Sequence, residues 1–195
     1  MMKKSYFIQT YNLNIFLSLI SISAICFGWL IKISLPNLFG KQAAQVIKRV
    51  GFYSLVAGMI LLVILFILIG IEWIIRIRDK SLLCWFKSIW QTIQIRSFLK
   101  QDQTVQKTAD TEEQQENVVN PVIEKFNVAV SRSVVDIKRN TIIVMIPIPK
   151  TQQSQEVLKD IQSQIKDEIA SKNINYYFSE VMRVGKNLFI IGNRR

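Results

Sequence analysis

Histidine is absent from this 195-residue sequence. Its absence removes the commonest general base, the Ser-His-Asp and Cys-His arrangements, and every histidine metal site. Only two cysteines occur, Cys26 and Cys84, and their separation excludes a chelating CxxC pair or a disulfide framework. Both are interpreted as small apolar side chains.

A phosphate-binding loop of the form GxxxxGK[ST] is missing as well. Gly-Lys pairs begin only at Gly40 and Gly185, and neither has the required upstream glycine or a following Ser or Thr. Asp136 and Glu180 fall on predicted strands, but no second feature indicates a pocket between them, and solvent-facing positions explain both. We therefore expect a non-enzymatic protein without ATPase activity, cofactor or metal site.

Acidic residues are scarce in the first half of the chain. Residues 1–100 contain 12 Lys or Arg but only Glu72 and Asp79, whereas residues 101–195 contain 13 basic and 12 acidic residues. The net charge of +11 therefore belongs almost entirely to the first half. Basic side chains beside apolar runs are typical of membrane topology signals and of contact with anionic lipids. Direct contact with DNA is the alternative interpretation.

Two long uncharged apolar runs occupy the same half, at about residues 15–31 and 51–71. Because a bilayer core of about 30 Å requires about 20 residues of helix, both are predicted to cross the membrane as a hairpin within residues 1–80. A cleaved signal peptide is the alternative for the first run.

Small residues recur at helical spacing in the second run, at Gly51, Ser54 and Gly58. Such a face lets another helix approach closely. Its partner is either the first run, which would close the hairpin, or a helix of another subunit, including a second copy of the chain.

Basic residues on the two sides of the hairpin predict its orientation. Six lie outside the two runs and four between them: Lys3, Lys4, Arg76, Arg78, Lys80 and Lys87 against Lys32, Lys41, Lys48 and Arg49. The positive-inside bias predicts a two-pass protein of the cell (plasma) membrane, with both termini in the cytosol and residues 32–50 outside.

Residues 81–100 are predicted to form an amphipathic juxtamembrane helix. Its apolar face contains Leu82, Trp85, Phe86, Ile89, Trp90 and Ile93. Tryptophan and lysine on such a helix favour the headgroup layer, although packing against a partner domain gives the same pattern. The residues expected at the membrane interface are Trp73, Arg76, Arg78, Trp85, Lys87 and Trp90.

A polar segment, residues 101–120, follows and is predicted to be a linker, because it has too little apolar surface to fold. Residues 121–195 are predicted to form a cytosolic α+β domain. Its first strand is expected from the alternation of Phe126, Val128 and Val130 through Val135, and its second at residues 141–148.

The rest of this domain is predicted to be one helix and two strands. Thr151 or Ser154 can cap the helix, whose apolar stripe is Val157, Leu158, Ile161, Ile165 and Ile169. Strands are expected at 176–184 and 188–191, with a turn at Gly185. The predicted fold class is thus a membrane helical hairpin plus a small α+β domain of order ββαββ.

Six basic residues fall near predicted turns and ends of this domain: Lys138, Arg139, Arg183, Lys186, Arg194 and Arg195. If they gather at one end of the sheet, they could contact DNA phosphates or an acidic partner. Solvated loops are the alternative explanation.

The order of parts resembles the N-terminal region of FtsK/TcpA-type coupling translocases of Gram-positive conjugative elements. In that family a hairpin like residues 15–71 anchors the enzyme, a segment like 76–100 leads from it, and a domain like 126–191 precedes the motor. The sequence ends at Arg195, where the ATPase domain of that family would begin. The resemblance therefore implies no catalytic residue, and either a detached anchoring subunit or an incomplete gene product.

The resemblance implies a membrane-anchored adaptor of a DNA-transfer complex of the conjugation or type IV secretion kind. Its partners would be the lipid bilayer and a coupling ATPase or relaxosome component. An accessory subunit of a transporter or secretion channel, using the Gly51 and Gly58 face, and a membrane-tethered DNA-binding protein are the alternatives.

Overall fold

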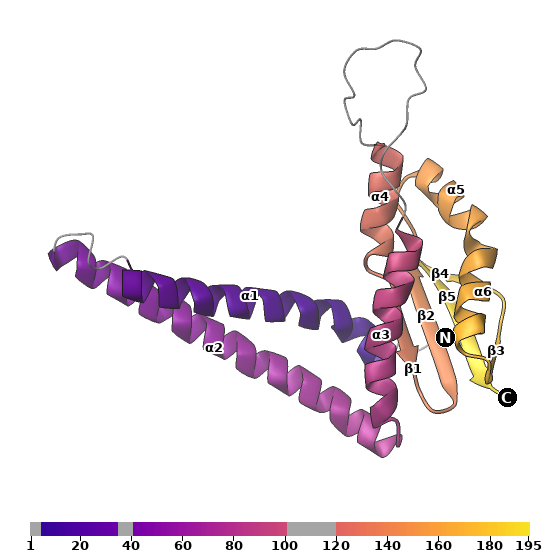
Figure 1. Ribbon diagram of the computed structural model, residues 1–195, viewed down its shortest axis with the longest axis horizontal. Helices are drawn as coiled ribbons and strands as arrows, with labels where there is room; N and C mark the ends of the chain where they lie inside the picture. The colour runs from indigo at the N-terminus through magenta and orange to yellow at the C-terminus, as the bar shows by residue number, and fades with distance from the viewer. Residues whose placement is uncertain (1–4, 35–40, 101–119) are drawn as a thin grey trace, which may run out of the picture. The chain divides into compact units, whose positions relative to one another are not determined.

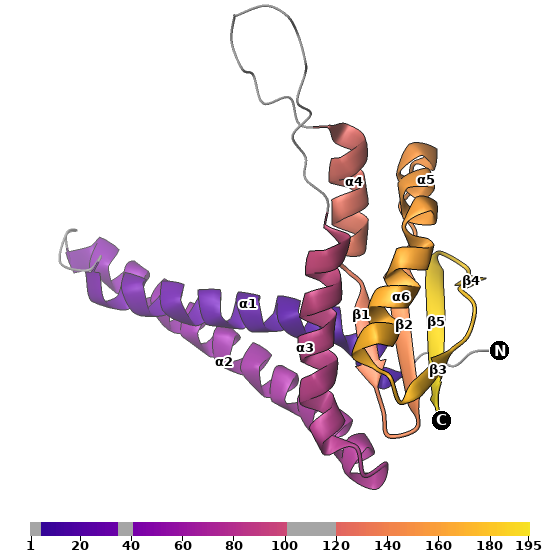
Figure 2. The ribbon, with the colours of Figure 1, turned by 45° about the vertical axis from the view of Figure 1, so that its right-hand side comes forward.

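The protein is described by a computed structural model over residues 5–34, 41–100 and 120–195 (Figures 1 and 2). The chain divides into two compact units, Met1–Arg78 and Asp79–Arg195. Two long apolar helices make up the described part of the first unit, and an antiparallel sheet with helices makes up that of the second. This confirms the general shape of the predicted fold class.

The first unit is an antiparallel pair of helices, α1 (Tyr6–Ser34) and α2 (Lys41–Arg78). Their 29 and 38 residues extend for about 44 Å and 57 Å at 1.5 Å per residue, more than the bilayer core requires. Both predicted spans lie inside these helices. The loop predicted at 32–50 is largely helical, because charged residues such as Lys48 and Arg49 do not end a helix that continues beyond the apolar layer.

Apolar side chains cover the outside of this hairpin. In the most apolar window of each helix only 17% and 11% of the residues are buried. Large exposed side chains include Phe16, Leu19, Phe66 and Ile74. A core helix of a soluble domain would hide such residues, whereas a helix in lipid exposes them. Both helices are therefore long and apolar enough to span a membrane.

The second unit contains one antiparallel sheet. Its main strands are β1 (Val134–Ile137), β2 (Thr141–Pro147) and β5 (Asn187–Arg194), in the spatial order β1-β2-β5. Two short strands, β3 (Tyr176–Phe178) and β4 (Met182–Val184), pair with successive parts of the far side of β5. The sheet thus has one edge at β1 and another along β3 and β4.

One face of the sheet forms the core. Alternate residues of β2, namely Ile142, Val144 and Ile146, are fully buried and pair in register with Ile190 and other residues of β1 and β5. Helices α3 (Leu82–Leu99), α4 (Pro121–Val130), α5 (Gln152–Asp160) and α6 (Gln162–Lys172) contribute to the same cluster. Their buried residues are Ile95, Leu99, Phe126, Val130, Leu158, Ile165 and Ile169.

Helix α3 lies along β1 (Figure 2), and side-chain hydrogen bonds join the helix to this edge of the sheet. The Ile137 N–H donates to Ser88 Oγ at 2.8 Å, and the Val135 N–H donates to Thr92 Oγ1 at 3.0 Å. One turn further, Arg96 Nε donates to the Ser133 carbonyl at 2.8 Å. Four helical residues rise about 6 Å and two strand residues about 6.6 Å, so the two periodicities match.

This arrangement corrects the predicted domain boundary. Helix α3 belongs to the same unit as the sheet. This unit begins at Asp79 rather than at residue 121. The predicted linker, 101–120, lies outside the described residues except for Asn120. Since α3 and α4 flank it and share one core, it connects two helices of a single domain.

The predicted first strand is wrong over residues 126–130, which form the end of helix α4. The Asn120 side chain accepts a hydrogen bond from the Val122 N–H at 3.0 Å, and Pro121 occupies the first helical position. Both features favour a helix start. Phe126 and Val130 then lie one turn apart in the core, while Val128 is 55% exposed.

Further along, the ββαββ order is not reproduced: from residue 121 the chain runs α4, β1, β2, α5, α6, β3, β4, β5. The predicted single helix breaks at Ile161 into α5 and α6. The predicted third strand is interrupted between Phe178 and Met182. The second strand and the turn at Gly185 are confirmed, and its φ of +61° suits glycine.

Replacing Ser88 with Ala should destabilise the second unit by about 1–3 kcal/mol, because the buried Ile137 N–H loses its acceptor. Ser97→Ala is the matched control, since Ser97 is exposed on the same helix. Urea unfolding of the full chain in mild detergent, followed by tryptophan fluorescence, measures both. Equal stability of the two variants would show that the hydroxyl does not support the strand edge.

Candidate functional site

The small residues of α2 contact α1. Ser54 Oγ donates to the Ala24 carbonyl at 2.8 Å. A Cβ added at Gly51 would lie 3.1 Å from the Gly28 carbonyl oxygen, and one added at Gly58 would lie 2.6 Å from Ile25 Cγ1. The structure therefore uses this face inside the hairpin, which is the first of the two partners considered above.

Gly28 is a part of this contact that the sequence reasoning missed. A Cβ at Gly28 would lie 2.8 Å from the Gly51 carbonyl oxygen, so two glycines face each other across the contact between α1 and α2. The sequence did contain a signal for this contact, because Gly28 is the only glycine in the first apolar run and so marks where another helix could approach. Paired glycines let backbones approach and increase the van der Waals contact that holds helices together in lipid.

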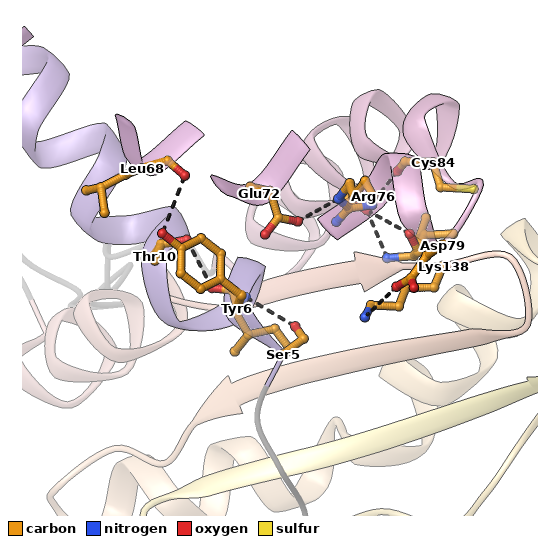
Figure 3. Close-up of polar contacts among 12 residues, drawn as sticks. Ser5, Tyr6, Thr10, Leu68, Glu72, Arg76, Asp79, Cys84 and Lys138 are labelled. Carbon is orange, nitrogen blue, oxygen red and sulfur yellow. Dashed lines mark hydrogen bonds and ion pairs between the residues drawn. The ribbon is translucent and has the colours of Figure 1, made fainter. Parts of the chain in front are cut away.

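A buried ion pair lies toward the other end of the hairpin (Figure 3). Arg76 Nε donates to Glu72 Oε1 at 2.6 Å, one turn apart on α2. The two side chains are only 1% and 6% exposed. Pairing lets both charges remain in an apolar segment, where a lone charge would be costly.

Residues at the start of α1 complete this polar end. The Arg76 guanidinium carbon lies 4.9 Å from the centre of the Phe7 ring, a cation–π distance. Tyr6 Oη donates to the Leu68 carbonyl at 3.4 Å, and Thr10 Oγ1 donates to the Tyr6 carbonyl at 3.0 Å. Arg76 was expected to face the membrane interface, but its side chain is buried and contacts Glu72 and Phe7.

The other residues expected at the interface differ in exposure. Arg78 and Lys87 are exposed, Trp73 is 45% exposed and Trp90 is 64% exposed. Trp85 is half-buried and its ring lies edge-on to Phe86, with centroids 5.0 Å apart. Lys87 and Trp90 are therefore available to a surface outside the protein.

The six basic residues of the second unit do not gather at one end of the sheet. Lys138, Arg139, Arg194 and Arg195 lie at the end where the β1–β2 turn meets the end of β5, since the Arg194 N–H donates to the Asn140 carbonyl at 2.9 Å. Arg183 and Lys186 lie at the opposite end, around the β4–β5 turn. Lys138 also pairs with Asp79 at 3.5 Å, which reduces the free charge.

Tyr176 fixes the first of these ends. Its hydroxyl donates to the carbonyls of Lys138 and Arg139 at 3.1 and 3.2 Å, and so ties the β1–β2 turn to β3. Burial raises the pKa of this hydroxyl above its ordinary value, and Arg194 opposes the shift. The hydroxyl therefore remains a donor across the physiological pH range.

An open groove of 410 Å³ lies between α5 and the β4–β5 end of the sheet. Its apolar lining residues are Ile148, Leu158, Val181 and Leu188. Its polar lining residues are Gln152, Gln155, Glu156, Lys159, Gln162 and Arg183. Beside it, Met182 and Val184 of the edge strand β4 are 40% and 41% exposed.

Asp136 and Glu180 are not brought together. They lie near opposite edges of the sheet, because β2 and β5 separate β1 from the edge formed by β3 and β4. Asp136 is fully buried, so its predicted solvent-facing position is wrong. Over the ranges 5–34, 41–100 and 120–195, no three His, Cys, Asp or Glu side chains are placed to hold a metal ion.

No family model matches the chain, and neither the curated proteins nor the solved structures gave a match.

Replacing Gly58 with Leu should separate the hairpin helices, because even a Cβ there contacts Ile25 and the Ser21 carbonyl. Gly70→Leu is the matched control, since no atom lies within 4 Å of a Cβ at Gly70. Nitroxide labels at Leu19 and Met59, in a background with Cys26 and Cys84 replaced by Ala, report the separation by pulsed EPR. An unchanged distance distribution in Gly58→Leu would contradict the close contact.

Glu72→Gln should destabilise the hairpin by about 3–5 kcal/mol, because it leaves the Arg76 charge buried without its carboxylate. The double variant Glu72→Gln/Arg76→Gln should lose less than the sum of the two single variants. Thermal unfolding in detergent measures the cycle. Additive effects would show that the ion pair contributes no coupling.

Proposed function

We propose that this chain is a two-pass protein of the cell membrane that holds a small α+β domain on the cytosolic side. The observation that carries the proposal is the outward apolar surface of α1 and α2. Only 17% of the most apolar window of α1 and 11% of that of α2 are buried. Lipid is the medium that accepts such a surface. The excess of basic residues outside the two spans supports cytosolic termini.

Within this anchor, we propose a non-enzymatic adaptor of a DNA-transfer complex of the conjugation or type IV secretion kind. The support is the order of parts, a hairpin followed by a basic amphipathic helix and a small α+β domain, which resembles the anchoring region of coupling translocases. The expected partner is a separate coupling ATPase or a relaxosome component. The lack of histidine and of a phosphate-binding loop favours a role in binding rather than catalysis.

The groove beside α5 and β4 is the surface best suited to this partner. Helix α3 occupies the β1 edge, whereas β3 and β4 form the opposite edge, and Arg183 of β4 lines the groove. An extended segment can add to such an edge through backbone hydrogen bonds, while its side chains enter an apolar groove. Two basic residues in its lining, Lys159 and Arg183, outnumber the single acidic one, Glu156, which favours a segment that carries an acidic residue.

Neither alternative role gains support from the geometry. The Gly51 and Gly58 face contacts α1, so it provides no reason to invoke the helices of a transporter or channel. The basic side chains are divided between two ends of the sheet, which weakens the case for a DNA-binding surface.

Affinity purification of the tagged full-length protein from its own cells, after light crosslinking in mild detergent, tests the proposal. We expect a coupling ATPase, relaxase or channel component to be recovered. Arg183→Glu should reduce this recovery, whereas Lys125→Glu, which reverses an exposed charge on α4, should not. Recovery of the protein alone would contradict the adaptor function, and equal recovery with both variants would exclude the groove as the docking surface.

A further inference from the structure

Helix α3 has an exposed apolar face that the domain does not use. This face consists of Leu82, Leu83, Phe86, Trp90 and Ile93, which are 41%, 86%, 63%, 64% and 54% exposed. At 100° per residue, these positions fall within one sector of the helix. Single exposed apolar residues are ordinary, but a continuous row of large ones indicates contact with another surface.

The opposite face of α3 is committed to the domain. Ser88 and Thr92 bond the β1 edge, and Ile95 and Leu99 belong to the core. A buried Gln91–Asn173 pair, with amide hydrogen bonds of 3.0 and 3.1 Å, joins the same face to the end of α6. Because these contacts fix the rotation of α3 against the sheet, its apolar face points away from the domain.

The chain itself indicates what lies against this face. Helix α2 ends at Arg78 and α3 begins at Leu82. Four Cα–Cα steps cover at most about 15 Å, so α3 begins within that distance of the end of a helix that is apolar enough to span a membrane. The apolar run of α2 ends at about residue 71, so α3 begins only 11 residues of chain after the predicted span.

The charge and composition of α3 fit that surface. The helix contains Lys87 and Arg96 but no Asp or Glu, and Arg78 and Lys80 come just before it. Basic residues are attracted to the anionic lipids of the cytoplasmic leaflet, and tryptophan rings prefer the headgroup level. A protein partner for this face would need no such basic surroundings.

We propose that the exposed face of α3 lies in the headgroup layer of the bilayer that α2 crosses. This inference rests on the proposed membrane anchoring and adds a second, peripheral contact. Because α3 also covers the β1 edge, lipid contact of α3 holds this edge of the sheet at the membrane surface. The groove and the β3–β4 edge, on the other side of the sheet, then remain directed to a partner.

Collision accessibility of nitroxide labels on the full-length protein in nanodiscs with anionic lipid tests this proposal. Single labels replace Phe86 and Trp90 on the proposed face, in a background with Cys26 and Cys84 changed to Ala. Val128 on α4, which is 55% exposed, is the matched control for an exposed apolar position in water. Phe66 on α2, which is 68% exposed, is the reference for lipid.

We expect the labels at 86 and 90 to collide readily with oxygen and to lose accessibility to a water-soluble nickel chelate, as at 66 and unlike at 128. Nickel accessibility equal to that at 128 would overturn the proposal, as would protection from both reagents, which indicates a covering protein. If position 66 itself is open to nickel, the membrane anchoring fails too, so the two failures are distinguishable.

A second measurement leaves α3 unchanged. In a variant with Trp29→Phe and Trp73→Phe, the remaining tryptophans are Trp85 and Trp90, both on α3. Brominated lipids should quench their fluorescence if the face contacts the bilayer. Unquenched emission would overturn the proposal.

Discussion

The hydrogen bonds between α3 and β1 join this helix to the sheet, so that both belong to one folded unit. Without them, β1 would be an open sheet edge, and α3 would be held only by its core residues and the Gln91–Asn173 pair. Ser88 and Thr92 satisfy alternate backbone N–H groups of the strand because one helical turn and two strand residues advance the chain by similar distances. An exposed strand edge invites pairing with other chains, so this contact removes one of the two edges at which such pairing could occur.

The two helices of the hairpin are apolar on the outside as well as between them, so other contacts must hold them to each other. At one end, Gly28 and Gly51 bring the backbones together and Ser54 bonds the Ala24 carbonyl. Toward the other end, Glu72 neutralises Arg76, which also contacts the Phe7 ring. Close packing and a paired charge thus act at different positions along the same hairpin. Together they hold the two helices in one register.

Features with one strong periodicity could be predicted from the sequence. The apolar runs predicted both long helices, and the residues of β2 predicted a buried strand. Gly185 predicted the turn that lies between β4 and β5. Residues 126–130 were misassigned because alternate apolar residues also fit a short helix, and the cap at Asn120 and Pro121 carries the deciding signal. Ser88 and Thr92 could not be recognised, because their role depends on a strand that lies more than 40 residues later in the sequence.

Placing α3 inside the domain changes the meaning of the polar residues 101–120. A tether between anchor and domain would set how far the domain reaches, and every added residue would extend it. Here the segment leaves and re-enters one domain, so the connection to the hairpin consists only of Asp79, Lys80 and Ser81. Loop closure entropy rises slowly with length, so the inserted segment can vary in length and charge at small cost to folding. The connection between the hairpin and the domain is therefore three residues long, whatever the length of the polar segment.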